Sequence, residues 1–232
     1  MKRISSLLVL GLAACSSSNN STVALNARAG TAASTASAPL GQQAQALQAC
    51  GAVINHVRMV ISEVKLEAEQ TSSDAGSSSG EVEFKTAPSL LDLDQSALDN
   101  GTTHQVIAAD VPAGTYHEIR FRIHNISSSE AGSDAGLQAM AGNSVKVDYT
   151  KTGATQPATF TSQLNEDQKM EGTFPLTDGS HALTLNLDAS TWFNNRNGGC
   201  LDPVKDTNAI EDNIKASLKA YKDDDHDGHE DH

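Results

Sequence analysis

The stretch YHEIRFRIHNI, residues 116–126, alternates apolar and polar side chains with a period of two. Ile119, Phe121 and Ile123 fall on one side of an extended chain, and charged or polar residues fall on the other side. Because successive side chains of a strand point to opposite faces, this pattern predicts a strand with one buried face and one wet face. Strands of this kind are typical of antiparallel sheets.

The same alternation recurs along the chain. HALTLNLD, residues 181–188, has a leucine at every second position, which again predicts one buried face and one wet face. VRMVISEVKLEA, residues 57–68, is rich in β-branched residues, and a change of phase near its middle indicates a bulge. Shorter strand candidates lie at residues 81–86, 105–108 and 144–149. Several short strands separated by glycine- and serine-rich loops predict a mainly β fold, an antiparallel β-sandwich over residues 50–206.

One segment has helical rather than strand periodicity. TNAIEDNIKASLKAY, residues 207–221, has Asn208 and Glu211 at the spacing of a capping box. The apolar residues that share one side of the expected helix are Ile210, Ile214, Leu218 and Tyr221. We therefore expect one C-terminal α-helix over residues 207–221, packed beside the sandwich.

The first fifteen residues, MKRISSLLVLGLAAC, have the parts of an export signal: basic residues, a short apolar run and small residues before Cys15. The apolar run is far shorter than the ~20 residues that span a bilayer. LAAC resembles the lipobox of bacterial lipoproteins, which implies a signal peptide at residues 1–14, lipidation of Cys15 and a membrane anchor. Ser16, by resemblance to Gram-negative sorting rules, implies the outer membrane. The alternative is an ordinary secretion signal that is cut near Ala14.

Residues 16–49 have the composition of a linker. Ser, Ala, Thr, Gly, Asn and Gln dominate, and the one charged residue is Arg28. Such a segment buries too little apolar surface to offset its chain entropy. Together with Cys15, we therefore expect residues 15–49 to be a lipid anchor and flexible tether, whose root-mean-square span is ~30 Å.

Cys50 and Cys200 are the two cysteines that remain after Cys15, and they lie at the two ends of the expected domain. An even pair in an exported protein predicts a disulfide, because the periplasm and the cell surface are oxidising. A catalytic thiol is the alternative, but no Cys-His-Asn spacing supports it.

Charge and motifs argue against several classes of function. The formal net charge is −13, and no basic stripe with interleaved aromatic residues predicts a nucleic-acid partner. An acidic body also avoids anionic lipid, so membrane contact is expected through the acyl chains. The sequence contains no His-Glu-x-x-His and no phosphate-binding glycine motif, and its Gly-x-Ser-x-Gly match at residues 76–80 lies in a glycine- and serine-rich loop. We therefore do not expect an enzyme.

The acidic tail KDDDHDGHEDH, residues 222–232, contains the pattern D-x-D-x-D-G-x-x-D. Alternate carboxylates followed by glycine resemble the calcium loops of EF-hands, dockerins and thrombospondin-type repeats. The acidic residue of position 12 and a following helix are missing from the pattern. The calcium ligands that this resemblance implies are Asp223, Asp225, Asp227, His229 and Asp231.

Three other interpretations of the tail stay open. His226, His229 and His232 recur at every third position, and imidazole suits zinc or copper. Like charges also keep a solvated acidic tail extended. Finally, Ala-Tyr-Lys-Asp-Asp-Asp resembles part of an epitope tag.

The segments VRMVISEVKLE, SLLDLDQ, VPAGTYHEIRFRI and LTLNLDAS, in this order, resemble an uncharacterised domain family of bacterial and archaeal lipoproteins. The resemblance covers residues 53–190, and its most distinctive motif is P-A-G-x-Y-x-x-I-R at residues 112–120. It implies a secreted, sandwich-like domain of unknown function at the cell surface, and it implies no activity.

The P-A-G-T-Y stretch itself predicts a turn that leads into a strand. Tyr116, Arg120 and Arg122 on that strand are a possible ligand face; the alternative is a solvated face on which the arginines pair with carboxylates. We expect a cell-envelope lipoprotein that acts as a surface binding or structural module, is stabilised by calcium, and binds an unknown envelope or surface ligand. The alternative function is a periplasmic or surface protein that handles transition metals through its His/Asp tail.

Overall fold

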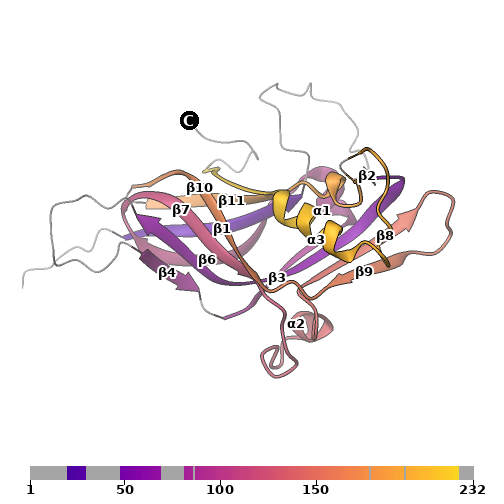
Figure 1. Ribbon diagram of the computed structural model, residues 1–232. Coiled ribbons are helices and arrows are strands. Elements are labelled where there is room, and N and C mark those ends of the chain that lie inside the picture. Colours follow the sequence, from indigo (N-terminus) through magenta and orange to yellow (C-terminus); the bar gives the residue numbers. More distant parts are fainter. Residues whose placement is uncertain are drawn as a thin grey trace, which may run out of the picture.

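The computed structural model describes residues 20–29, 48–68, 81–85, 87–177, 179–195 and 197–224. These residues form two β-sheets and a few short helices (Figure 1). The expected signal peptide and Cys15 lie outside the described residues. The predicted fold class, a mainly β sandwich with a helix near the C-terminus, is confirmed.

The smaller sheet has four strands in the order β12-β11-β1-β6. Their bounds are Leu218–Lys222 for β12, Gly179–Leu187 for β11, Asn20–Ala29 for β1 and His104–Pro112 for β6. β1 pairs in parallel with β11 and antiparallel with β6, and β12 pairs antiparallel with β11. The sandwich is therefore antiparallel except for one parallel pair.

The larger sheet is built around β3 (Ala52–Ala68), a strand of 17 residues. Its main path runs β10-β7-β3-β8-β9, with β10 at Glu166–Leu176, β7 at Gly114–Ile123, β8 at Val145–Lys151 and β9 at Ala158–Ser162. Three shorter strands also pair with β3: β2 (Gln48–Ala49), β4 (Glu81–Lys85) and β5 (Ser89–Asp94). The predicted bulge in β3 is confirmed, because the register with β7 shifts between Ser62 and Lys65.

The helices are short. They are α1 (Gln95–Asn100), α2 (Ala135–Ala139), the 3-10 turn η1 (Ala189–Thr191) and α3 (Thr207–Ala216). Asp94 caps α1 and Asp134 caps α2, each by accepting a hydrogen bond from a backbone N–H of the first turn. In the part of the chain that the structure describes, no helix has the length and hydrophobicity that a membrane crossing requires.

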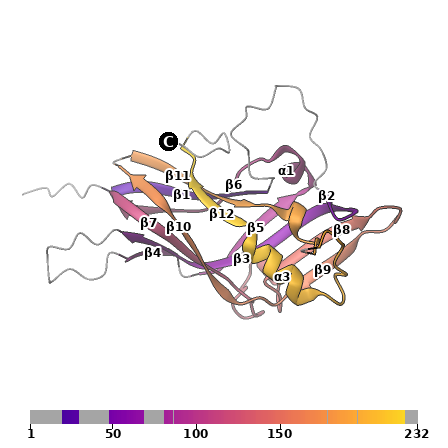
Figure 2. The same cartoon turned by 45° about the horizontal axis from the view of Figure 1, so that its top comes forward.

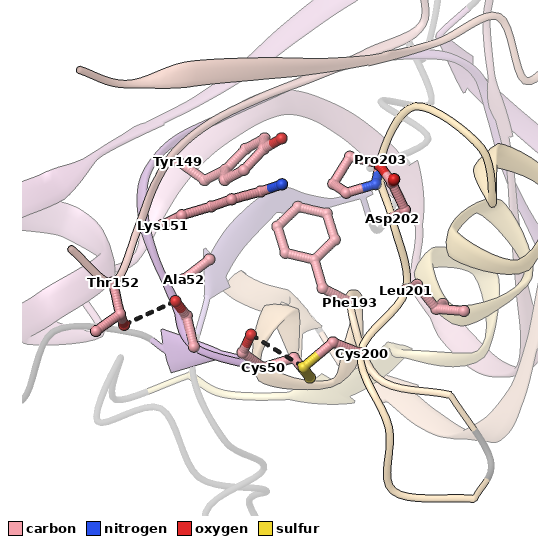
Figure 3. Close-up of a pocket in the computed structure, with 11 residues that line it drawn as sticks. Cys50, Ala52, Tyr149, Lys151, Thr152, Phe193, Cys200, Leu201, Asp202 and Pro203 are labelled. Carbon is pink, nitrogen blue, oxygen red and sulfur yellow. Dashed lines mark hydrogen bonds between the residues drawn. A yellow bond between two sulfur atoms is a disulfide. The ribbon is translucent and has the colours of Figure 1, made fainter. Parts of the chain in front are cut away.

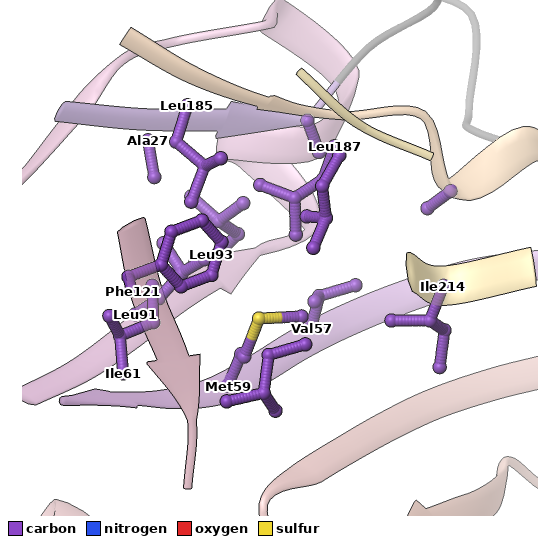
Figure 4. Close-up of a cluster of buried hydrophobic side chains, with 14 of the residues drawn as sticks. Ala27, Val57, Met59, Ile61, Leu91, Leu93, Phe121, Leu185, Leu187 and Ile214 are labelled. Atoms are coloured by element: carbon purple, nitrogen blue, oxygen red, sulfur yellow. The ribbon is translucent and has the colours of Figure 1, made fainter. Parts of the chain in front are cut away.

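Side chains from both sheets and from α3 meet in one apolar core (Figure 4). The alternation in β7 is confirmed, because Ile119, Phe121 and Ile123 are all buried. The wet face that we expected for residues 181–188 is wrong for their second half, because Thr184 and Asn186 are buried as well. The labelled core residues of Figure 4 are Ala27, Leu185, Leu187, Val57, Met59, Ile61, Leu91, Leu93, Phe121 and Ile214.

The expectation of a flexible tether is wrong for residues 20–29, which form the inner strand β1. Val23, Leu25 and Ala27 alternate along β1 and face the core, where they are buried. The stretch VALNARA has the period-two pattern of a strand. Small residues weaken that pattern, and hydrogen bonds to β11 on one side and β6 on the other supply the stabilisation that composition does not indicate.

The expected helix over residues 207–221 is too long, because α3 ends at Ala216 and the chain continues as strand β12. Figure 2 shows α3 leading directly into β12. Ser217 lies at the change of direction, where its hydroxyl accepts a hydrogen bond from the buried Trp192 Nε1 at 2.8 Å. Pairing with β11 therefore overrides the helical spacing of Leu218 and Tyr221. The expected capping box is also absent, because the N-cap of α3 is Asp206 without a side-chain cap hydrogen bond, and Glu211 accepts a hydrogen bond from Ser162.

Candidate binding site

A pocket of about 400 Å³ opens beside the disulfide at one end of the sandwich (Figure 3). Three segments that are distant in the sequence build it: the β2–β3 turn, the end of β8, and the chain that follows η1. The lining residues are Cys50, Gly51, Ala52, Tyr149, Lys151, Thr152, Phe193, Cys200, Leu201, Asp202 and Pro203.

The disulfide between Cys50 and Cys200 is present, as predicted, with the two Cα atoms 5.4 Å apart. This separation is ordinary for a disulfide. Cys50 and Gly51 form the tight β2–β3 turn with φ values of 47° and 72°. Because both thiols are consumed in the bond, neither is a nucleophile in this structure. The bond instead fixes one wall of the pocket to another.

Two aromatic rings form the apolar wall of the pocket. The ring centroids of Tyr149 and Phe193 lie 5.0 Å apart, and the planes are tilted by 59°. Phe160 supports Phe193 from a centroid distance of 6.3 Å with an edge-to-face geometry. Both arrangements are favourable for aromatic pairs, so the two ring contacts stabilise the wall.

Three polar groups surround this apolar wall. Tyr149 is only 4% exposed as a residue, but its hydroxyl is not a buried atom and makes no hydrogen bond to the described part of the chain. Burial, and then the negative charge of Asp202, raise the pKa of Tyr149, so its hydroxyl is neutral and able to donate. Lys151 follows two residues later on the same side of β8 and has no ion-pair partner among the described residues. In Figure 3 the polar ends of Tyr149 and Lys151 point the same way, towards Asp202 and Pro203.

Tyr116, Arg120 and Arg122, the possible ligand face, do not lie together on one exposed surface. Tyr116 is 2% exposed, belongs to the apolar core, and donates its hydroxyl hydrogen to the Pro112 carbonyl at 2.8 Å. This contact fixes the turn that precedes β7. Tyr116 therefore stabilises the fold and is not accessible to a ligand.

Arg120 and Arg122 lie on the outer face of the larger sheet and form ion pairs with carboxylates, as the solvated-face alternative predicts. Arg120 contacts Glu118, and its Nη2 atom lies 2.9 Å from Glu67. Arg122 contacts Glu63 at 2.8 Å and Asp167 at 2.7 Å. Both guanidinium groups are thus occupied by neighbouring strands.

Glu118 is the buried member of this network, with only 2% of its side chain exposed. Arg120 approaches it from one side, and Lys169 Nζ lies 2.5 Å from its carboxylate on the other. Burial raises the pKa of Glu118, but hydrogen bonds from Lys169 and Arg120 and their positive charges together lower this pKa below its usual value. The charged carboxylate therefore stabilises the fold above the usual pKa, and this contribution is lost as pH falls through the lowered pKa.

We expect Glu118→Gln to lower the free energy of unfolding by about 1–3 kcal/mol at pH 7, because it removes charge-assisted hydrogen bonds. The difference from wild type should shrink at pH 3, which urea denaturation at the two pH values measures. Glu171→Gln is the matched control, since Glu171 contacts the same Lys169 but is 79% exposed. Equal effects of the two substitutions, or an effect that is independent of pH, would contradict this account.

The structure describes only residues 222–224 of the acidic tail. Asp223, the first implied calcium ligand, is buried and accepts a hydrogen bond from the Thr184 hydroxyl at 2.9 Å. Asp225, Asp227, His229 and Asp231 lie outside the described residues, as do the other tail histidines. Within the described ranges, no three His, Cys, Asp or Glu side chains gather as a metal site. Calcium binding and zinc or copper binding by the tail therefore stay predictions.

The sequence alone identified the two cysteines of the pocket and none of its other residues. Tyr149 closes the strand candidate at residues 144–149, but nothing in its surroundings distinguishes it from a core tyrosine. The disulfide places residues 50–52 beside residues 200–203, and this proximity was the available signal. The position of β8 next to β3 is a long-range pairing that the sequence pattern does not specify.

Comparison with known proteins gave one match. The family model described as Domain of unknown function (DUF4382) matches residues 49–201. The match includes both bonded cysteines and most of the pocket, whereas β1, α3 and β12 lie outside it. The expected resemblance to an uncharacterised domain family is thereby confirmed in its coarse form. No curated protein and no solved structure matched the chain.

Proposed function

Since the chain belongs to the DUF4382 family, a domain family of unknown function, we propose a role from its own residues: a lipid-anchored cell-envelope protein whose sandwich is a binding or structural module. The observation that carries this proposal is the Cys50–Cys200 disulfide. Such bonds persist in oxidising compartments, and the export signal that ends at Cys15 directs the chain to such a compartment. The outer membrane, implied by Ser16, is part of the same proposal.

The position of β1 changes how the module would be held. Only residues 16–19 separate Cys15 from the first residue of β1, Asn20. At ~3.5 Å per extended residue, Asn20 lies no more than about 18 Å from the anchored cysteine. The sandwich is thus kept close to the bilayer, in place of the looser tether that composition predicted.

The same position orients the module. Asn20 pairs with Pro112 at the end of β6, and Ser21 pairs with Gly179 at the start of β11. In the proposed arrangement, this end of the sandwich faces the lipid. Several acyl chains on one cysteine anchor stably, because each buried CH₂ adds ~0.8 kcal/mol.

Membrane fractionation of the full chain in a Gram-negative host tests the proposal. We expect the wild-type protein in the outer-membrane fraction after a carbonate wash, and Cys15→Ala in the soluble or unprocessed fraction. Ser16→Asp is the control for sorting, because it keeps Cys15 and should move the protein to the inner membrane. Retention of Cys15→Ala in the membrane at the wild-type level would overturn the anchor.

A further inference from the structure

We propose that the pocket beside the Cys50–Cys200 disulfide binds a small monocarboxylate with a flat apolar body. The inference deepens the proposed binding role and rests on it for its biological setting. Four observations support it: the size of the pocket, its aromatic wall, an accessible tyrosine hydroxyl that makes no hydrogen bond to the described residues, and a lysine ammonium group with no ion-pair partner among them.

The size and the wall define the apolar part of the ligand. A volume of about 400 Å³ lies at the lower end of the ~300–1,000 Å³ typical of small-molecule sites. The Tyr149 and Phe193 rings, with Leu201 and Pro203 nearby, form a surface that suits a ring or a short chain. The disulfide keeps this surface in place because it joins the β2–β3 turn to the segment that contains Leu201.

The Tyr149 hydroxyl indicates a hydrogen-bond acceptor on the ligand. The Tyr116 hydroxyl donates to the Pro112 carbonyl, whereas the Tyr149 hydroxyl stays accessible and can donate to a ligand in the pocket. Tyr149 makes no such bond among the described residues, and its ring lines the pocket. An acceptor atom of a ligand in the pocket can replace water as the hydrogen-bond partner of this hydroxyl.

Lys151 supplies the charge that selects a carboxylate. Its ammonium group lies on the same side of β8 as the Tyr149 hydroxyl, so the two donors can approach one anionic group together (Figure 3). Asp202, on the opposite wall, already accepts a hydrogen bond from the Val204 backbone N–H at 3.0 Å. Its negative charge would keep the ligand carboxylate on the β8 side, with the apolar body towards Phe193, and would disfavour a dianion.

Calorimetric titration of the mature protein in lipid nanodiscs tests this site with three probes of one shape: benzoate, neutral benzamide and cationic benzylamine. We expect saturable benzoate binding with a Kd of about 1 mM, as suits a ligand of this size. Benzamide should bind about tenfold more weakly, because it lacks the charge-assisted contact. Benzylamine should be the weakest of the three.

Two substitutions locate the binding. Tyr149→Phe keeps the ring and removes only the hydroxyl, and Lys151→Gln removes only the charge. Each should weaken benzoate about five- to tenfold without changing the melting temperature, and Lys151→Gln should leave benzamide unchanged. Lys219→Gln is the matched control, because Lys219 is exposed on β12 and does not line the pocket.

The inference is overturned if no probe saturates, if benzylamine binds more tightly than benzoate, or if both substitutions leave benzoate affinity unchanged. The titration is independent of whether the proposed lipid anchor exists. If Cys15 carries no lipid, the same titration on the soluble mature chain still decides whether the pocket binds a carboxylate.

Discussion

Val23→Asp will unfold most of the domain, although Val23 lies in a stretch with the composition of a linker. Its side chain is fully buried in β1, where its backbone neighbours are His181 of β11 and Ala109 of β6. An unpaired carboxylate at this position costs on the order of 4 kcal/mol or more, a large fraction of the stability of a typical domain. Urea denaturation followed by tryptophan fluorescence measures the loss, because Trp192 is buried in the same core.

Val204→Asp is the matched control for this experiment. Val204 is 85% exposed, so the same chemical change at that position should alter the free energy of unfolding by less than about 0.5 kcal/mol. A Val23→Asp variant as stable as Val204→Asp would mean that β1 does not belong to the sandwich in solution. That result would also contradict the proposal that the sandwich is held close to the bilayer through Cys15.

Replacement of both bonded cysteines, Cys50→Ala with Cys200→Ala, is the second large effect that we expect. The bond closes a sequence separation of 150 residues, for which the chain-entropy estimate is about 5 kcal/mol of stabilisation. The double variant should therefore show a much lower urea midpoint than the oxidised wild type. Wild type in reductant is the control, and it should match the variant.

The double substitution also distinguishes the effect of the disulfide on stability from the effect of the backbone turn at Cys50. Cys50 adopts a positive φ of 47°, which alanine disfavours as much as cysteine does, so the turn itself costs the same in both proteins. If oxidised wild type, reduced wild type and the double variant unfold at the same urea concentration, the disulfide does not stabilise the fold, and its role in fixing the pocket is excluded.

The fold was predictable where a strand has one wet face and large apolar residues. Ile119, Phe121 and Ile123 in β7 meet both conditions, and the structure buries all three. β1 meets neither condition, because its inward residues include alanines and because Asn26, on its other side, is buried as well. Its existence depends on β6 and β11, which lie far along the chain, and local periodicity does not contain that information.

The helix predicted over residues 207–221 was partly wrong for a different physical reason. Ile210 and Ile214 are buried on α3 as the helical spacing predicts. Leu218 continues the same spacing, but it pairs with Leu187 as the first residue of β12. Between them, Ser217 accepts the indole hydrogen bond of Trp192 and ends the helix, a tertiary contact that no local pattern indicates.

Of the residues in the binding site, the sequence predicted only the two cysteines. Tyr149 and Lys151 were assigned to a strand or left without a role, because their importance depends on what lies opposite them. Phe193 and Asp202 reach the pocket only because the disulfide and the pairing of β8 with β3 bring three chain segments together. A residue pair such as Tyr149 and Phe193, 44 positions apart, has no sequence signature.

The end of the sandwich where β1 begins and the pocket lie at opposite ends of the larger sheet. β3 begins at Ala52, which lines the pocket, and ends at Ala68, which pairs with Tyr116 beside the end that β1 enters. A strand of 17 residues spans about 50 Å at ~3.3 Å per residue. In the proposed arrangement, the pocket therefore faces away from the bilayer and is accessible to small solutes of the envelope.

Mass spectrometry of the N-terminal peptide from the mature, membrane-extracted protein tests the proposed anchor most directly. The account predicts that this peptide begins at Cys15 and contains acyl chains on that residue, directly ahead of the four residues that lead into β1. A mature N-terminus with an unmodified Cys15, or a chain that still begins at Met1, would contradict it.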